Sequence, residues 1–424
     1  MIYTFKDICT KIGSGATPSG GKEAYKGGEY ALVRSQNVLD YTFTTTGLAY
    51  INELQAKKLD GVKVESGDVL LNITGDSVAR ACIIPNEILP ARVNQHVAII
   101  RGNRKVVLNE YLLYFLQYNK QLLLSISQGG GTRSAITKKM IEDLEIDLPS
   151  IKEQEKVVSL LKSIDHKIEL NRQINDNLEQ QAQALYKSWF VDFEPFKDGE
   201  FMDSELGLIP EGWQVGTYEQ IIQTTISGDW GKDVITGNYT HKVACVRGCD
   251  FQDMSIGVRG KTPERYILEK NYQAKRLIDN DVIVEISGGT STISTGRVCL
   301  INADLLGKYN HDIVCTNFCK VARPVQSYGA YLYYSWKYKY DCRVMFGYEN
   351  GTSGIKNFQI SDFLGKEPVI IPSGSSIKAF QTIIETLQNN IQTNGSEIMK
   401  LEALRDTLLP KLMSGELKIN DLDC

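Results

Sequence analysis

Apolar residues recur at alternating spacings of four and three between Leu148 and Phe196. This a/d repeat predicts one long helix whose apolar seam packs against a partner helix. Ser150 and Glu153 form an S-x-x-E capping box at its start, and residues 192–195 are expected to end it. The seam positions are Val157, Leu161, Ile164, Ile168, Asn171, Asn175, Leu178, Ala182, Leu185 and Trp189.

A second seam with the same spacing lies 223 residues further along, and eight of its ten positions are apolar. Asn171 maps onto Asn394, so we interpret both as polar residues that set the register of the seam. About 40 helical residues would span about 60 Å, which predicts a rod between the flanking segments. The alternative is two amphipathic helices, each packed on its own domain. The second seam consists of Phe380, Ile384, Leu387, Ile391, Asn394, Ile398, Leu401, Arg405, Leu408 and Leu412.

The segments that precede the two helices repeat one another. Each contains short β-like runs punctuated by glycine and one helical patch, and with an offset of 213 residues Val33-Arg34 matches Val246-Arg247 and Asp68 matches Asp281. The offset becomes 223 near Asn94 and 220 near the Gly131-Thr132 loop. The prediction is an α+β protein with two tandem-repeat mixed α/β domains separated by two long helices. The predicted parts are 1–149 (first domain), 150–205 (long helix), 206–372 (second domain) and 373–424 (long helix).

Length and charge narrow the classes of function. A chain of 424 residues is too long for one core. The net charge of −4 argues against a free-standing non-specific DNA binder, but it allows basic residues confined to one groove. Because the sequence has no apolar run of about 18–20 residues and no signal-like start, we expect a cytoplasmic protein without membrane contact.

The cysteines permit two interpretations. Nine cysteines are an odd count, so free thiols are expected. Two pairs share one spacing, Cys245/Cys249 and Cys315/Cys319, which makes a four-thiolate zinc site conceivable. Both pairs lie in β-like runs where buried cysteines act as small hydrophobic residues, and we therefore expect no metal.

We find no constellation typical of catalysis. The sequence contains no H-E-x-x-H, G-x-S-x-G or G-x-G-x-x-G motif, and the glycine-rich run that starts at Gly15 departs from the phosphate-loop pattern because Glu23 follows Lys22. No catalytic residues are expected, which disfavours a self-sufficient methyltransferase or nuclease.

Three stretches resemble the specificity subunits of type I restriction–modification systems. IDLPSIKEQEKVVSLLKSID with ALYKSWFVDFEPF resembles their central conserved region, LLPKLMSGEL their distal conserved region, and LGLIPEGW the entry to their second target-recognition domain. There are two departures. Ser376-Ile377 replaces the Glu153-Gln154 of the first copy, and Gly395 inside the second helix, which costs about 1 kcal/mol relative to alanine, is expected to make that helix less regular.

The resemblance implies a non-catalytic DNA-reading subunit. Each target-recognition domain would read one half of a bipartite, asymmetric site in double-stranded DNA, and the long helices would form an antiparallel coiled coil that sets the spacing. Two adenine-methyltransferase subunits would dock on the helices and use S-adenosylmethionine, and restriction/translocase subunits that use ATP and Mg²⁺ could join them. This chain would bind none of these cofactors, and the isolated chain could self-associate. The alternative is a coiled-coil scaffold that presents two protein- or carbohydrate-binding heads.

Candidate DNA contacts follow from side-chain chemistry, because Arg and Lys suit guanine, Asn and Gln suit adenine, and Ser and Thr suit either. Loops on a shared scaffold carry recognition, and the loops of the two copies differ. Arg34 and Arg247 occupy equivalent positions, and each could instead form a structural ion pair. Lys138 and Lys139 are expected to contact phosphates. The first-domain candidates are Arg34, Ser35, Gln36, Asn37, Asn72, Thr74, Thr132, Arg133 and Ser134. The second-domain candidates are Arg247, Asp250, Ser287, Thr290, Ser291, Thr352, Ser353, Lys356 and Asn357.

Overall fold

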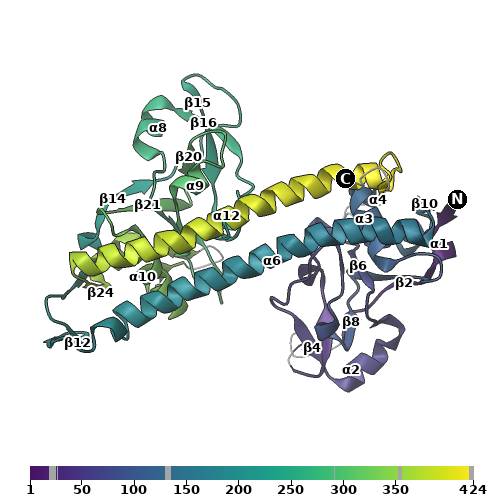
Figure 1. Cartoon of the computed structure of the whole chain (residues 1–424), viewed down its shortest axis with the longest axis horizontal. Coiled ribbons are helices and arrows are strands. Elements are labelled where there is room, and N and C mark those ends of the chain that lie inside the picture. The colour runs from purple at the N-terminus through teal and green to yellow at the C-terminus, as the bar shows by residue number, and fades with distance from the viewer. Residues whose placement is uncertain (19–24, 26, 129–134, 291, 352–355, 420–424) are drawn as a thin grey trace. The chain divides into compact units, whose positions relative to one another are not determined.

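The computed structural model describes residues 1–18, 25, 27–128, 135–290, 292–351 and 356–419 (Figure 1). The chain forms two compact units: unit 1 consists of Met1–His166 and Leu401–Cys424, and unit 2 consists of Lys167–Lys400. Both units contain helices and mainly antiparallel strands, so the predicted α+β class is confirmed. Within the described residues, no helix combines the length and the apolar character needed to cross a membrane.

Two helices of 40 residues each, α6 (Ile151–Phe190) and α12 (Gly374–Met413), confirm the two predicted long helices (Figure 1). The predicted capping box is present, since the Ser150 amide donates to Glu153 Oε2 at 2.9 Å and the Glu153 amide donates to Ser150 Oγ at 3.4 Å. The hydrogen bonds that the Ser150 hydroxyl and amide donate to the Glu153 carboxylate lower its pKa. Beyond α6, Phe193 adopts a left-handed conformation with φ of 54°.

Unit 1 is built from two four-stranded sheets. One is antiparallel in the order β2-β9-β6-β7, and the other has the order β4-β3-β8-β5, with β3 and β8 parallel. The strands of the first sheet are β2 (Cys9–Ser14), β9 (Val97–Gly102), β6 (Val69–Asn72) and β7 (Ala81–Ile83). Those of the second are β4 (Ala49–Ile51), β3 (Tyr30–Val33), β8 (Ala91–Val93) and β5 (Lys63–Val64). A separate pair joins β1 (Ile2–Thr4) to β10 (Glu145–Asp147).

The core of unit 1 follows the period of two in its strands. Val69 and Leu71 of β6 face a cluster that includes helix α3 (Asn109–Tyr118) and the first turns of α6, whereas Leu70 faces the second sheet. Helices and two sheets thus form successive layers. The remaining helices of unit 1 are α1 (Phe5–Ile8), α2 (Glu53–Lys58), α4 (Lys120–Ser127) and α5 (Lys138–Glu142).

Unit 2 repeats this topology. One sheet is antiparallel in the order β14-β21-β17-β19, and the other has the order β16-β15-β20, with β15 and β20 parallel. These strands are β14 (Ile222–Ser227), β21 (Cys319–Pro324), β17 (Val282–Glu285), β19 (Val298–Leu300), β16 (Glu264–Leu268), β15 (Tyr239–Val246) and β20 (Ile313–Cys315). The first sheets of the two units have the same strand order, and β16-β15-β20 matches β4-β3-β8, without a counterpart of β5 among the described residues. This shared pairing supports the tandem duplication.

The described residues of unit 2 also form three smaller sheets and five shorter helices. The strands are β11 (Phe201–Ser204), β12 (Gly207–Pro210), β13 (Gln214–Thr217), β18 (Ser287–Gly288), β22 (Glu349–Asn350), β23 (Lys356–Phe358) and β24 (Pro368–Ile371). The helices are α7 (Phe251–Ser255), α8 (Glu269–Lys275), α9 (Ala303–Leu306), α10 (Gly329–Asp341) and α11 (Ile360–Lys366).

The strand registers correct one predicted offset. Asn72 pairs with Val97 in unit 1, and Glu285 pairs with Cys319 in unit 2. Because Asn72 and Glu285 differ by 213, Val97 and Cys319 are equivalent at an offset of 222, not 223. Because both copies contain an asparagine there, the sequence alignment matched Asn94 with Asn317. At an offset of 222 residues, the equivalent of Asn94 is Thr316.

The long helices make two kinds of contact, with one another and with the globular layers. In unit 2, Asn171 donates to Glu397 at 2.8 Å, and Asn394 donates to Asn175 at 2.8 Å, so residues of α6 contact residues of α12. In unit 1, Arg405 of α12 lies over the ring of Tyr41 of the globular part. The helices therefore contact one another, as the seam predicts, and they also contact the globular layers, as the alternative of amphipathic helices packed on their own domains predicts.

The predicted seam residues are buried or half-buried. The buried ones are Val157, Leu161, Ile164, Ile168, Asn171, Ile384 and Ile391. The half-buried ones are Leu178, Leu185, Leu387, Asn394, Leu401 and Leu408.

Candidate nucleic-acid interface

In unit 1, polar side chains follow the ends of β2 and β6 and precede β9; we call Thr17, Thr74, Gln95 and His96 rim 1. Strands β6 and β9 are antiparallel neighbours, and the Ile73 amide donates to the His96 carbonyl at 3.0 Å, which places Thr74 beside His96. Thr74 Oγ1 lies 2.6 Å from His96 Nδ1, and Gln95 Nε2 lies 2.9 Å from His96 Nε2. Thr17 Oγ1 donates to Gln95 Oε1. Rim 1 thus presents a connected set of hydrogen-bonding groups.

Only Thr74 of rim 1 was predicted. His96, Gln95 and Thr17 belong to no recognisable sequence motif. The repeat could have indicated Gln95 and His96, because they directly follow Asn94, where the two copies were aligned. Thr74 also bridges to Ala135, the first described residue after the glycine-rich loop.

In unit 2, the structure brings together predicted residues that lie 70 positions apart; we call Ser287, Thr290, Lys356 and Asn357 rim 2. Ser287 of β18 pairs with Asn357 of β23, and its Oγ donates to Asn357 Oδ1. Lys356 Nζ lies 2.6 Å from Glu349 Oε2, so its charge is balanced within the unit. The exposed Thr290 closes a turn in which its amide donates to the Ile293 carbonyl at 2.7 Å.

The equivalent arginines Arg34 and Arg247 have different partners. Arg247 donates to both carboxylate oxygens of Asp250, at 3.1 and 3.0 Å, and this ion pair raises the pKa of Arg247. Arg34 instead donates from Nη2 to the Gly47 carbonyl at 2.5 Å. Arg247 thus forms the structural ion pair that was the alternative to a DNA contact. Arg34 does not, because Asn37 occupies the position equivalent to Asp250.

The predictions for Asn37, Asn72 and Asp250 as base contacts are wrong. Asn37 and Asn72 are 0% exposed and Asp250 is 2% exposed. Asn37 donates to the Thr44 carbonyl at 3.0 Å and Asn72 to the Ser35 carbonyl at 2.9 Å. These side chains hold the turns after β3 and β15, and buried polar groups with such partners are not available to DNA.

The other predicted residues are at the surface or outside the described part. Ser35 is half-buried, and Gln36 is exposed with its amide donating to the Gly47 carbonyl at 3.1 Å. Lys138 and Lys139 are exposed on α5 and pair with carboxylates one turn later. The residues that lie outside the described range are Thr132, Arg133, Ser134, Ser291, Thr352 and Ser353.

Arg80 is a further basic residue that the sequence did not reveal. In unit 2, Arg297 binds Glu285 through two hydrogen bonds of 2.8 and 2.6 Å. The strand registers make Arg80 the equivalent of Arg297 and Asn72 the equivalent of Glu285. Because neutral Asn72 cannot balance an arginine, half-buried Arg80 lacks the carboxylate that its counterpart has, and the described residues of unit 1 supply no other ion pair to it.

Comparison with known proteins identifies the relatives. Residues 1–180 match the model of the type I restriction modification DNA specificity domain. The type I restriction enzyme MjaIX specificity subunit of Methanocaldococcus jannaschii is 26% identical, over 99% of this chain and 94% of its own length. The HindI specificity subunit of Haemophilus influenzae is 26% identical, over 91% of this chain and 94% of its own length. The chain is therefore similar, over nearly its full length, to type I restriction enzyme specificity subunits.

Both relatives are specificity subunits, the class of protein that three stretches of the sequence resemble. Among solved structures, a type I S subunit from M. genitalium aligns with a TM-score of 0.48 and 15% identity, covering 97% of this chain and 95% of that chain.

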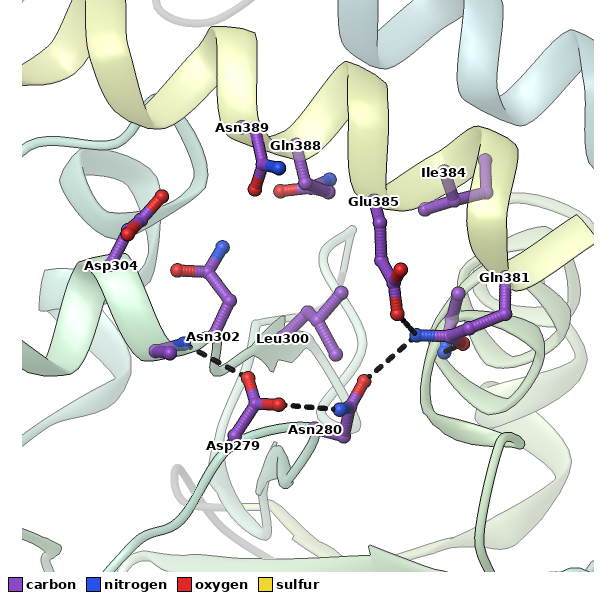
Figure 2. A pocket seen from close by; sticks show the side chains of 12 residues that line it. Asp279, Asn280, Leu300, Asn302, Asp304, Gln381, Ile384, Glu385, Gln388 and Asn389 are labelled. Carbon is purple, nitrogen blue, oxygen red and sulfur yellow. Dashed lines mark hydrogen bonds between the residues drawn. The ribbon is translucent and has the colours of Figure 1, made fainter.

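A hollow of about 270 Å³ in unit 2 is lined by side chains other than those of rim 2 (Figure 2). Figure 2 shows a hydrogen-bonded chain at its edge, in which Asn280 donates to Asp279 at 2.8 Å and Gln381 of α12 donates to Asn280 and Glu385 at 3.0 Å each. Asp304 adds a third carboxylate to the lining. These contacts attach α12 to the loop before β17, and an acidic lining does not suit a phosphate.

Three of the four paired cysteines are buried. Burial raises the pKa of the Cys245 and Cys319 thiols to about 12, and it also raises the pKa of Cys315. Cys249, in contrast, is exposed. In the described ranges, no three side chains of His, Cys, Asp or Glu are grouped as a metal site would require.

Proposed function

We propose that this chain is the DNA-sequence-recognition subunit of a type I restriction–modification enzyme, and that each unit reads one half of a bipartite, asymmetric site. The observation that carries the proposal is one scaffold with two different sets of rim side chains. Equivalent backbone positions hold Thr74 and Ser287, and His96 and Phe318. Equal scaffolds with unequal reading residues suit a site whose halves differ.

The side chains of the two rims suit base edges in the major groove. Hydroxyl groups of Thr17, Thr74 and Ser287 can donate or accept, and the amides of Gln95 and Asn357 match the donor and acceptor pair of adenine. The proposed contacts of unit 1 are Arg34, Ser35, Gln36 and rim 1, and those of unit 2 are rim 2 and Arg247. The loop residues Thr132, Arg133, Ser134, Ser291, Thr352 and Ser353 remain proposed base contacts.

Phosphate contacts would come from Lys138, Lys139 and Arg80. Phosphate contacts fix orientation and dominate affinity, whereas base contacts give specificity. Since the chain carries a net charge of −4, it would bind tightly only together with partner subunits.

The long helices would set the spacing between half-sites as an antiparallel coiled coil and dock two adenine-methyltransferase subunits. Exposed apolar side chains on α6 and α12 support docking, among them Leu170 at 41%, Ile383 at 40% and Leu404 at 46% exposure. The partners would use S-adenosylmethionine, and restriction subunits, where present, would use ATP and Mg²⁺. Domain boundaries at 149, 205 and 372 remain part of this proposal.

Equilibrium binding of the complex with its methyltransferase to duplex DNA tests the proposal. The observed binding constant for a specific site should fall steeply and linearly with salt on logarithmic axes, and should exceed that for scrambled DNA by about 10³-fold or more. Equal affinity for specific and scrambled duplexes would refute sequence reading by this chain.

A further inference from the structure

Phe318 is a large apolar residue whose side chain is exposed to solvent beside rim 2. It is 63% exposed, although its backbone is held on both sides: the Ile286 amide donates to its carbonyl at 2.8 Å, and its own amide donates to Thr316 Oγ1 at 3.2 Å. Ile286 immediately precedes Ser287, so the backbone fixes Phe318 next to the residues proposed to read DNA. An exposed aromatic ring on a backbone that is fixed beside the proposed reading residues is available to contact DNA.

The equivalent residue of unit 1, His96, differs from Phe318 in its side-chain chemistry. His96 receives the same backbone hydrogen bond, from the Ile73 amide, but its ring takes part in the polar chain of rim 1. Phe318 cannot hydrogen bond, and its neighbours Ser287 and Asn357 bond to one another. Where rim 1 offers hydrogen-bonding groups, this point of rim 2 offers only an apolar surface.

Ile293 adds to the apolar character of the turn that follows β18. Its side chain is 52% exposed, and its carbonyl accepts the Thr290 amide. Rim 2 therefore combines a few hydroxyl and amide groups with two exposed apolar side chains.

The major groove of DNA has one apolar feature, the 5-methyl group of thymine, and phenylalanine is among the side chains that contact it. We infer that Phe318 reads a thymine methyl group in the half-site recognised by unit 2. The inference rests on the proposed function, and it names one base in that half-site. Because His96 occupies the equivalent position in unit 1, we expect no requirement for a thymine methyl group in the half-site that unit 1 reads.

Deoxyuridine tests the inference, since it differs from thymidine only by this methyl group. The purified complex with the methyltransferase is titrated against duplexes in which each thymine of the second half-site is replaced in turn by uracil. Replacement at one position should weaken binding about fourfold, the effect of burying one methyl-sized group. In Phe318→Ala, thymine and uracil at that position should bind equally, whereas Phe318→Leu should retain part of the difference.

A matched control is Leu208→Ala, which removes a side chain of similar exposure, 61%, from the β11–β12 hairpin and should keep the wild-type difference. The inference is overturned if the second half-site contains no thymine, if uracil binds as tightly as thymine at every position, or if Phe318→Ala keeps the thymine preference. Failure of Phe318→Ala to assemble with the methyltransferase would assign Phe318 to a protein contact and also overturn it. In each case a methylated bipartite motif would leave the proposed function intact, and its absence would refute that function.

Discussion

Gly395, inside helix α12, lies directly against the backbone of Gly257. A Cβ added to Gly395 would lie 2.1 Å from the Gly257 carbonyl oxygen and 2.3 Å from its carbonyl carbon. Close by, Lys308 Nζ donates to the Gly257 carbonyl at 2.6 Å and to the Gln392 carbonyl at 2.8 Å. The glycine expected to make the helix less regular lies within a continuous helix and lets a loop of the same unit approach it.

This contact reverses the usual effect of a glycine-to-alanine change in a helix. On propensity alone, Gly395→Ala would stabilise the protein by about 1 kcal/mol. Because backbone atoms leave no room for the methyl group, we expect destabilisation by about 1–3 kcal/mol, the range for overpacking. Gly374→Ala in the same helix, where an added Cβ meets nothing within 4 Å, is the control and should be neutral or stabilising. Urea unfolding checks both, and a gain in stability for Gly395→Ala would contradict the contact.

A buried ion pair recurs in both units. Asp68 accepts from Arg101 at 2.7 and 2.8 Å, and Asp281 accepts from Arg323 at 2.8 and 2.9 Å, with both carboxylates 0% exposed. We expect Asp68→Asn to destabilise the protein by about 3 kcal/mol, because it leaves the Arg101 charge partly unbalanced. Thermal unfolding measures the loss, and Arg101→Met added to Asp68→Asn should recover part of it. A neutral single variant would show that the pair contributes nothing.

Thiol reactivity should separate two classes of cysteine. Cys249 and Cys342 are exposed, whereas Cys299 and the three buried cysteines Cys245, Cys315 and Cys319 are not. Alkylation of the folded chain at pH 8 with mass spectrometry should label only Cys249 and Cys342 among the described cysteines. Protection of Cys249 together with the buried three, released only by a chelator, would support the zinc alternative instead.

The same burial makes stability depend on alkaline pH. Burial raises the pKa of Cys299 from 9.0 to about 12. A folded pKa above the unfolded one gives stability that is complete below pH 9 and is lost as the pH rises toward 12. The urea midpoint should therefore fall between pH 9 and pH 11, and Cys299→Ala should show a smaller fall. An equal fall in the variant would mean that Cys299 does not contribute.

Arg80 and Arg297 provide a matched pair for DNA binding. Arg80→Ala should weaken binding of the methyltransferase complex to specific and scrambled DNA alike, and it should reduce the salt slope by about one. Arg297→Ala removes the partner of buried Glu285 and should mainly lower the thermal stability of the chain. Unchanged binding by Arg80→Ala, measured by fluorescence anisotropy, would contradict the role of Arg80.

The sequence predicted what depends on periodicity. Both long helices, the capping box of Ser150 and the repeat of Asp68 at Asp281 follow from spacing alone, and the structure contains all of them. The candidate site was harder to predict, because polar loop residues look alike in sequence. Asn72 is buried and holds a turn, whereas His96 lies on the rim, and only strand register separates the two. Phe318 also escaped notice, since an apolar residue in a β-like run is expected to be buried.

Expression of this chain with its proposed methyltransferase partner, followed by sequencing of the methylated bases of the host DNA, tests whether each unit reads its own half-site. We expect N6-methyladenine confined to one split, asymmetric motif. Exchanging residues 1–149 for those of another family member should then change one half of that motif and leave the other half and the spacing unchanged. Methylation without a split motif, or a change in both halves after the exchange, would contradict the claim that each unit reads its own half-site.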